Sequence, residues 1–157
     1  SAARAEELAV GPRWVARSWT LDDGLPQNSV NAILQTVDGH LYLGTFGGLA
    51  RFDGVDFDVQ GPREGLPASR ITALHTASDG ALWIGTEDAG VFRSTAGNGF
   101  EKVPLPALPL GPVVGIQGDR DGATWIATSR AFSACRSCRR NARSISNASM
   151  SGSNGLA

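Results

Sequence analysis

The chain has 157 residues, of which 41% are hydrophobic, and its formal net charge is −1. This length is typical of one ordinary domain, and the apolar fraction is large enough to bury a core over most of it. A near-neutral charge argues against nucleic-acid binding, which requires a basic surface. No stretch approaches the roughly 20 apolar residues of a membrane span. We therefore expect no nucleic-acid partner and no membrane contact by this segment.

The amino-terminal residues suggest export to a bacterial periplasm. The chain begins at Ser1 without Met, and Ala3-Arg4-Ala5 is typical of a small-residue cleavage site whose apolar region has been removed. A polar, disordered terminus is an equally good interpretation. We interpret residues 1–13 as a disordered segment of an exported protein.

A segment that occurs nearly three times dominates the rest of the chain. Residues 38–45 (DGHLYLGT) recur as residues 79–86 (DGALWIGT) and again as residues 121–128 (DGATWIAT), at spacings of 41 and 42 residues. A period of this size is typical of repeat architectures.

Each repeat predicts short strands in the same order. A Pro-containing turn precedes an alternating run, because Pro cannot extend a β-ladder and period-two alternation is typical of a half-buried strand. An Asp-Gly hairpin leads to a second strand, and Gly-containing turns lead to a third and a fourth. The predicted strands are 29–34, 41–45, 48–52 and 57–59, then 70–74, 82–86, 90–93 and 100–103, then 113–116 and 124–128.

Four short antiparallel strands in about 40 residues make a propeller blade. We therefore predict an all-β fold, a partial β-propeller with two complete four-stranded blades, part of a third, and a disordered carboxy-terminal tail. A further strand at 14–19 stands where the outermost strand of a preceding blade would fall. The predicted limits are 14–130 for the propeller, about 27–60, 66–104 and 110–130 for the blades, and 131–157 for the tail.

The repeat pattern breaks after Thr128. Residues 131–135 read Ala-Phe-Ser-Ala-Cys where a third strand should supply Gly, two apolar residues and Arg, and residues 133–157 contain no aromatic residue. Codons for these five residues, read one base earlier, can encode Gly-Leu-Phe-Arg-Leu, which is the missing strand. We hypothesise a frameshift near codon 131, and sequencing the gene across codons 125–157 would test it.

The repeats resemble a known family. Residues 19–26 (WTLDDGLP), 28–33 (NSVNAI), 38–45 and 48–54 (GLARFDG) closely resemble the two-component regulator propeller repeat, and the resemblance extends over about 19–128. It implies the periplasmic sensor half of a bacterial signalling protein, followed by a membrane helix and a histidine kinase or diguanylate cyclase output. The sequence contains none of the output motifs, which indicates an input domain or a piece of one.

Three functions stay open. The first is a non-catalytic propeller that senses a small-molecule or glycan-type ligand and shifts the disposition of propellers. The second is a structural or protein-interaction propeller. The third, a lyase or hydrolase, is disfavoured because His40 and His75 are the only histidines and no base–nucleophile pair is visible. We expect no enzyme activity of this fragment, no catalytic residue and no cofactor.

The expected partners are the missing blades and the output domain of the same protein. Three blades in an open array leave two large apolar faces bare. The chain alone should therefore be poorly soluble or should self-associate, for example as a homodimer.

Side chains at blade ends that differ between repeats, most of them polar, are the best candidates for ligand contacts, with ordinary solvated loops as the alternative. They lie around the first strand of each blade and in the loops after the second strand. The candidates are Gln27, Asn28, Asn31, Phe46, Ser69, Arg70, Glu87 and Asp88.

Two recurring positions have simpler explanations than binding. The aspartates that precede Gly are expected in hairpins rather than as metal ligands, and the aromatic residues of the second strands are expected to pack between blades. These residues are Asp38, Asp79 and Asp121, and Tyr42, Trp83 and Trp125.

Cys135 and Cys138 form a Cys-x-x-Cys motif without the context that a redox or zinc site needs. A thioredoxin-like pair lies between a strand and a helix, and zinc needs a second ligand pair. We expect no metal site.

Overall fold

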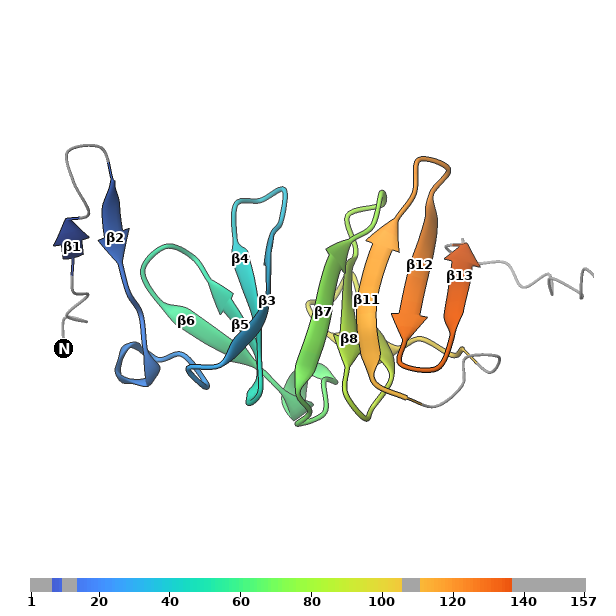
Figure 1. The fold of residues 1–157 in the computed structure, drawn as a ribbon, viewed down its shortest axis with the longest axis horizontal. Coiled ribbons are helices and arrows are strands. Elements are labelled where there is room, and N and C mark those ends of the chain that lie inside the picture. Colours follow the sequence, from blue (N-terminus) through green and yellow to red (C-terminus); the bar gives the residue numbers. More distant parts are fainter. Residues whose placement is uncertain (1–6, 10–13, 106–110, 137–157) are drawn as a thin grey trace, which may run out of the picture.

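The structure is a computed structural model that describes residues 7–9, 14–105 and 111–136 (Figure 1). Its elements are short strands and two turns of 3₁₀ helix. Within these ranges, none of the helices has the length and apolar character needed to cross a membrane. The strands are β1 Glu7–Ala9, β2 Val15–Arg17, β3 Val30–Gln35, β4 Leu41–Thr45, β5 Gly48–Phe52, β6 Phe57–Gln60, β7 Ile71–Thr76, β8 Leu82–Thr86, β9 Val91–Ser94, β10 Phe100–Lys102, β11 Val113–Gly118, β12 Ala123–Thr128 and β13 Phe132–Arg136, and the helices are Leu21–Asp23 and Pro62–Glu64.

Strands β3 to β13 form three meandering antiparallel sheets, which we call blades 1, 2 and 3, and β1 and β2 form a separate two-stranded sheet. Blade 1 has the order β3-β4-β5-β6, blade 2 the order β7-β8-β9-β10, and blade 3 the order β11-β12-β13. They stand side by side in chain order in Figure 1. The predicted all-β propeller fold, with two four-stranded blades and part of a third, is confirmed.

Local turn chemistry explains the hairpins between the first two strands of each blade. Gly39 and Gly80 have φ values of 89° and 83°, which is the left-handed conformation that glycine adopts without steric cost. The Asp79 carboxylate accepts a hydrogen bond from the backbone amide of Ala81 at 3.1 Å. Asp79 is therefore a turn residue, as expected.

The hydrophobic core lies between blades. One cluster fills the boundary of blades 1 and 2, and a second fills the boundary of blades 2 and 3, so blade 2 is covered on both faces. The buried residues of the first are Leu49, Leu66, Ile71, Leu82, Ile84 and Phe92, and those of the second are Ala73, Ala77, Trp83, Val91, Val113, Ile116 and Ile126.

Two of the three recurring aromatic residues pack between blades, as expected. Trp83 is 2% exposed within the second cluster, and Tyr42 packs against the first. Trp125 stacks instead on Phe132 of β13, with ring centroids 5.0 Å apart.

The disordered tail was predicted to begin at residue 131, but residues Phe132–Arg136 form strand β13. The structure extends blade 3 with β13, whose residues pair with β12 from Ala127 opposite Phe132 to Ala123 opposite Arg136. The ladder forms because its hydrogen bonds need only backbone groups, and stacking on Trp125 anchors Phe132. The rest of the expected tail, residues 137–157, lies outside the described residues.

The amino-terminal expectation also needs correction. Within the expected disordered segment, β1 forms a strand, and it pairs with β2. The strand expected at 14–19 is thus β2, at Val15–Arg17, and its partner is a short hairpin strand rather than a blade. The other residues of segment 1–13 lie outside the described residues.

The register of blade 3 agrees with the frameshift hypothesis. Arg51 stands opposite Tyr42 in blade 1, and Arg93 stands opposite Trp83 in blade 2. Ala134 stands opposite Trp125 in blade 3, and the alternative reading frame would place an arginine at this position. The frameshift itself stays a prediction about the gene.

Candidate functional site

Five of the eight predicted ligand residues meet at one end of blades 1 and 2. This is the end at which β7 and β11 begin, at the bottom of Figure 1. We call the group the loop cluster. Its members are Phe46, Ser69, Arg70, Glu87 and Asp88.

Arg70 is the centre of the loop cluster. Its guanidinium carbon lies 3.7 Å from the centroid of the Phe46 ring, and its Nη1 donates a hydrogen bond to Glu87 Oε1 at 3.1 Å. The Arg70 and Glu87 side chains are 39% and 44% exposed, so the ion pair faces solvent. A cation–π contact at such a site contributes about 0.5–1 kcal/mol, and the ion pair contributes a similar amount or less.

A second contact holds the two loops of blade 2 together. The buried Ser69 hydroxyl donates a hydrogen bond to Asp88, and the backbone amide of Glu87 donates to the carbonyl of Arg70 at 3.0 Å. The loop cluster is therefore an organised surface that joins both blades.

The other three predicted residues lie apart from these contacts. The Asn31 amide donates to the carbonyl of Ile71 at 3.1 Å and so links the inner strands of blades 1 and 2. Asn28 Oδ1 accepts the backbone amide of Leu21 at 2.9 Å. Gln27 Oε1 is buried and has no hydrogen-bond partner among the described residues. An unpaired buried acceptor costs about 1–3 kcal/mol.

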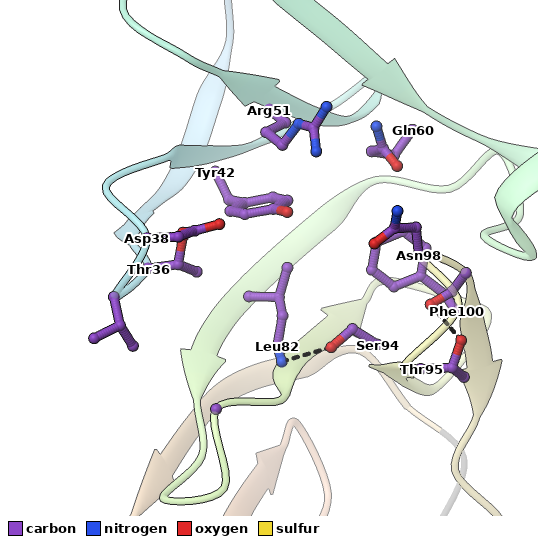
Figure 2. A pocket seen from close by; sticks show the side chains of 13 residues that line it. Thr36, Asp38, Tyr42, Arg51, Gln60, Leu82, Ser94, Thr95, Asn98 and Phe100 are labelled. Atoms are coloured by element: carbon purple, nitrogen blue, oxygen red, sulfur yellow. Dashed lines mark hydrogen bonds between the residues drawn. The ribbon is translucent and has the colours of Figure 1, made fainter.

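A cavity of about 340 Å³ lies between blades 1 and 2 at the opposite, hairpin end (Figure 2). Its volume is at the lower end of the range for small-molecule sites. Figure 2 shows Tyr42, Arg51 and Gln60 on one side and Leu82, Ser94, Thr95, Asn98 and Phe100 on the other. The lining residues are Thr36, Val37, Asp38, Tyr42, Arg51, Gln60, Gly80, Leu82, Ser94, Thr95, Asn98, Gly99 and Phe100.

The cavity combines charged and neutral polar groups. A hydrogen bond from the Thr36 hydroxyl, followed by the contact with His40, lowers the pKa of Asp38 to about 2, and His40 Nδ1 lies 2.8 Å from Asp38 Oδ2. Burial raises the pKa of the Tyr42 phenol, although the nearby Arg51 opposes this shift. At neutral pH the cavity therefore offers a carboxylate acceptor and a protonated phenol donor.

The sequence analysis missed this cavity because strand patterns do not show whether neighbouring blades leave a space. It assigned Asp38 to a hairpin and Tyr42 to packing between blades, whereas both also line the cavity. One signal was available. Blade 1 has Phe52 at the end of its third strand, stacked on Phe57 at 4.6 Å. Blade 2 has the small Ser94 at the same place, where its hydroxyl accepts the amide of Leu82 at 2.9 Å. The smaller side chain leaves part of the boundary with blade 1 unfilled.

In the described ranges, no group of three or more His, Cys, Asp or Glu side chains is placed to hold a metal ion. Cys135 lies on β13, whereas Cys138 lies outside the described residues.

The sequence model of a family described as the two-component regulator propeller matches residues 24–47 and 65–88. These segments are two-component regulator propeller repeats. Each repeat runs from the turn before the first strand, through the Asp-Gly hairpin, to the loop after the second strand. Both therefore include the turns that carry the loop cluster. None of the curated proteins compared with the chain matches it.

Solved structures with the same fold include extracellular domains of two-component systems and a lyase. The extracellular domain of BT3049 of B. thetaiotaomicron, described as a hybrid two-component system, has a TM-score of 0.63 and 22% identity, over 73% of this chain and 16% of that one. The extracellular domain of BT4673 of the same organism, also described as a hybrid two-component system, has a TM-score of 0.52 and 17% identity, over 78% and 23%.

Virginiamycin B lyase of Staphylococcus aureus also has the fold, with a TM-score of 0.55 and 18% identity, over 78% of this chain and 45% of the lyase. The chain thus spans less than half of the length of each of these three structures. These similarities establish the propeller fold of the repeats and not their activity.

Proposed function

We propose that this chain is part of the exported, periplasmic input region of a bacterial signal-transduction receptor, and that it senses a ligand without catalysis. The observation that carries the proposal is the cavity of about 340 Å³ whose walls come from two different blades. Two similar structures are extracellular domains of proteins described as hybrid two-component systems, which supports export. The output in the intact protein would be a histidine kinase or a diguanylate cyclase.

The cavity suits a small polar ligand that carries several hydroxyl groups. Gln60 and Asn98 supply amides that donate and accept, Asp38 supplies an acceptor, and Phe100 supplies an apolar ring. A small-molecule or glycan-type ligand could use all of these groups.

A ligand held by both blades would favour the arrangement of blades in which it fits best. This effect requires differential affinity and no bond breaking. The loop cluster, which also joins blades 1 and 2, is the second candidate for the same role.

The experiment is a thermal-shift screen of the full chain against a panel of monosaccharides, oligosaccharides and small polar metabolites. A ligand at 100 times its Kd stabilises the folded state by about 2.7 kcal/mol, which is readily detected. We expect Gln60→Ala and Tyr42→Phe to reduce the shift, while Val55→Thr, in an exposed turn away from the cavity, leaves it unchanged.

Arg70→Ala separates the two candidate sites. A shift that is lost in Arg70→Ala and kept in Gln60→Ala would assign the ligand to the loop cluster. A full panel without any shift would contradict ligand sensing by this fragment and favour a structural or protein-interaction propeller.

A further inference from the structure

The two blade boundaries are built from the same knob-and-hole contact. A methyl group placed on Gly44 of blade 1 would lie 2.6 Å from Ile71 Cγ2 of blade 2, and one placed on Gly85 would lie 2.5 Å from Val113 Cγ1 of blade 3. Both distances are shorter than real carbon contacts. Each glycine is thus a hole that admits the first residue of the next inner strand, a close approach that only glycine allows.

The face of blade 1 that points away from blade 2 carries a knob that enters no hole among the described residues. Val30 occupies the register position of Ile71 and Val113, since each pairs with the last threonine of the second strand. Ile71 and Val113 are 0% and 1% exposed, whereas Val30 is 44% exposed. Ile33, three residues further along, is 66% exposed, whereas its counterpart Ile116 is 8% exposed.

Blade 3 lacks the matching hole on its own free face. Ala127 stands at the register position of Gly44 and Gly85. Val114 replaces Asn31, whose amide bonds to the next inner strand in blade 1. Phe132, which is 69% exposed, replaces the fully buried Leu49 and lies over Trp125. A knob that approached blade 3 as Val113 approaches Gly85 would meet the Ala127 methyl group.

We propose that the face of blade 1 that carries Val30 and Ile33 docks on another two-component regulator propeller blade, one with glycine at the position of Gly44 and Gly85. Blade 3 of a second copy cannot be that blade. The argument is repetition within this chain, because the same contact forms at both internal boundaries. The proposal is independent of ligand sensing and identifies which missing blade the exposed knob requires.

The experiment builds the missing hole into blade 3 of the full chain. The acceptor is Ala127→Gly with Phe132→Leu and Val30→Asp, so it has a hole and no knob. The donor is the wild-type chain, which has a knob and no hole. By light scattering, each alone should remain at the mass of one chain, and the mixture should form a complex of twice that mass. For the wild-type chain this replaces the self-association expected from the sequence, because Ala127 leaves blade 3 without a hole for the knob of a second copy.

Two comparisons keep the test sharp. A donor that carries Val30→Asp should restore the mass of separate chains, and circular dichroism establishes that every variant is folded. If the triple variant fails to fold, Ala127→Gly alone replaces it and should self-associate head to tail, a contact type that forms rings or filaments.

The proposal is overturned if no complex forms with folded variants. It is also overturned if the complex persists with the Val30→Asp donor. Self-association of the wild-type chain that Val30→Asp abolishes would overturn it as well, because Ala127 would then accept the knob.

Discussion

Blade 2 and blade 3 share a repeat but differ in environment. All five residues of β8 are buried, whereas two of the six residues of β12, Trp125 and Ala127, are partly exposed. Trp83 is 2% exposed between two blades, and Trp125, at the same position, stacks on Phe132 within its own blade. The difference shows that a repeat position acquires its burial from its neighbours, as expected where each repeat contacts only adjacent repeats.

The largest loss of stability should come from truncating Ile84, the residue before the glycine hole at Gly85. Ile84 is 0% exposed in the first cluster, so Ile84→Ala should lower the free energy of unfolding by about 2–5 kcal/mol. Leu43, its partly exposed counterpart in blade 1, has less apolar area to lose, and Leu43→Ala should cost roughly half as much. Urea unfolding followed by tryptophan fluorescence measures both. Equal losses would show that the neighbouring blade does not set the contribution.

Filling the glycine hole should cause the next largest loss of stability. A methyl group on Gly85 would lie 2.5 Å from Val113 Cγ1 and 2.9 Å from its Cβ, so Gly85→Ala should destabilise by about 1–3 kcal/mol through overpacking. Gly115, on the adjacent inner strand, has nothing within 4 Å of the added atom. Gly115→Ala should therefore be neutral or stabilising by about 0.5–1 kcal/mol. A similar destabilisation at both sites would place the cost in the strand backbone rather than at the boundary.

The loop cluster should stabilise the boundary of blades 1 and 2, and not that of blades 2 and 3, by a smaller free energy. Arg70 lies over Phe46 at the boundary of blades 1 and 2, whereas the corresponding positions at the next boundary hold Pro112 and Glu87. A double-mutant cycle of Arg70→Ala and Phe46→Leu should give a coupling energy of about 0.5–1 kcal/mol. A coupling of zero would mean that the stacked pair makes no net contribution in water.

The smallest effect should be a pH dependence from His75. Burial lowers its pKa below the ordinary value of 6.5, so the unfolded chain takes up a proton more readily than the folded chain. The stability contribution is thus fully present above pH 6.5 and decreases as the pH falls below it. His75→Gln, which installs the side chain that blade 3 has at Gln117, should flatten this dependence in unfolding midpoints between pH 5 and 8. If the unfolding midpoint of His75→Gln varies with pH as steeply as that of the wild-type chain, the pH dependence comes from other titratable groups.

Much of the fold could be predicted because the decisive interactions are local. Period-two alternation and Asp-Gly turns specify strands and hairpins within a few residues, and the 41-residue spacing identifies the blades. The loop cluster was also within reach, because residues that vary between repeats at blade ends lie on neighbouring loops. Strand β13 was not, since Ala134 and Ser133 carry no apolar pattern and the ladder depends on the edge that β12 offers.

By itself the sequence determined the repeat, its turns, and the strand order within each blade. The tertiary structure alone decided which residues meet across blades: Arg70 over Phe46, Ile71 in the hole at Gly44, and the cavity beside Ser94. The physical reason is the distance along the chain over which each kind of interaction acts. Turn and strand preferences act between adjacent residues, whereas contacts between blades depend on the shapes of two surfaces about 40 residues apart in the chain.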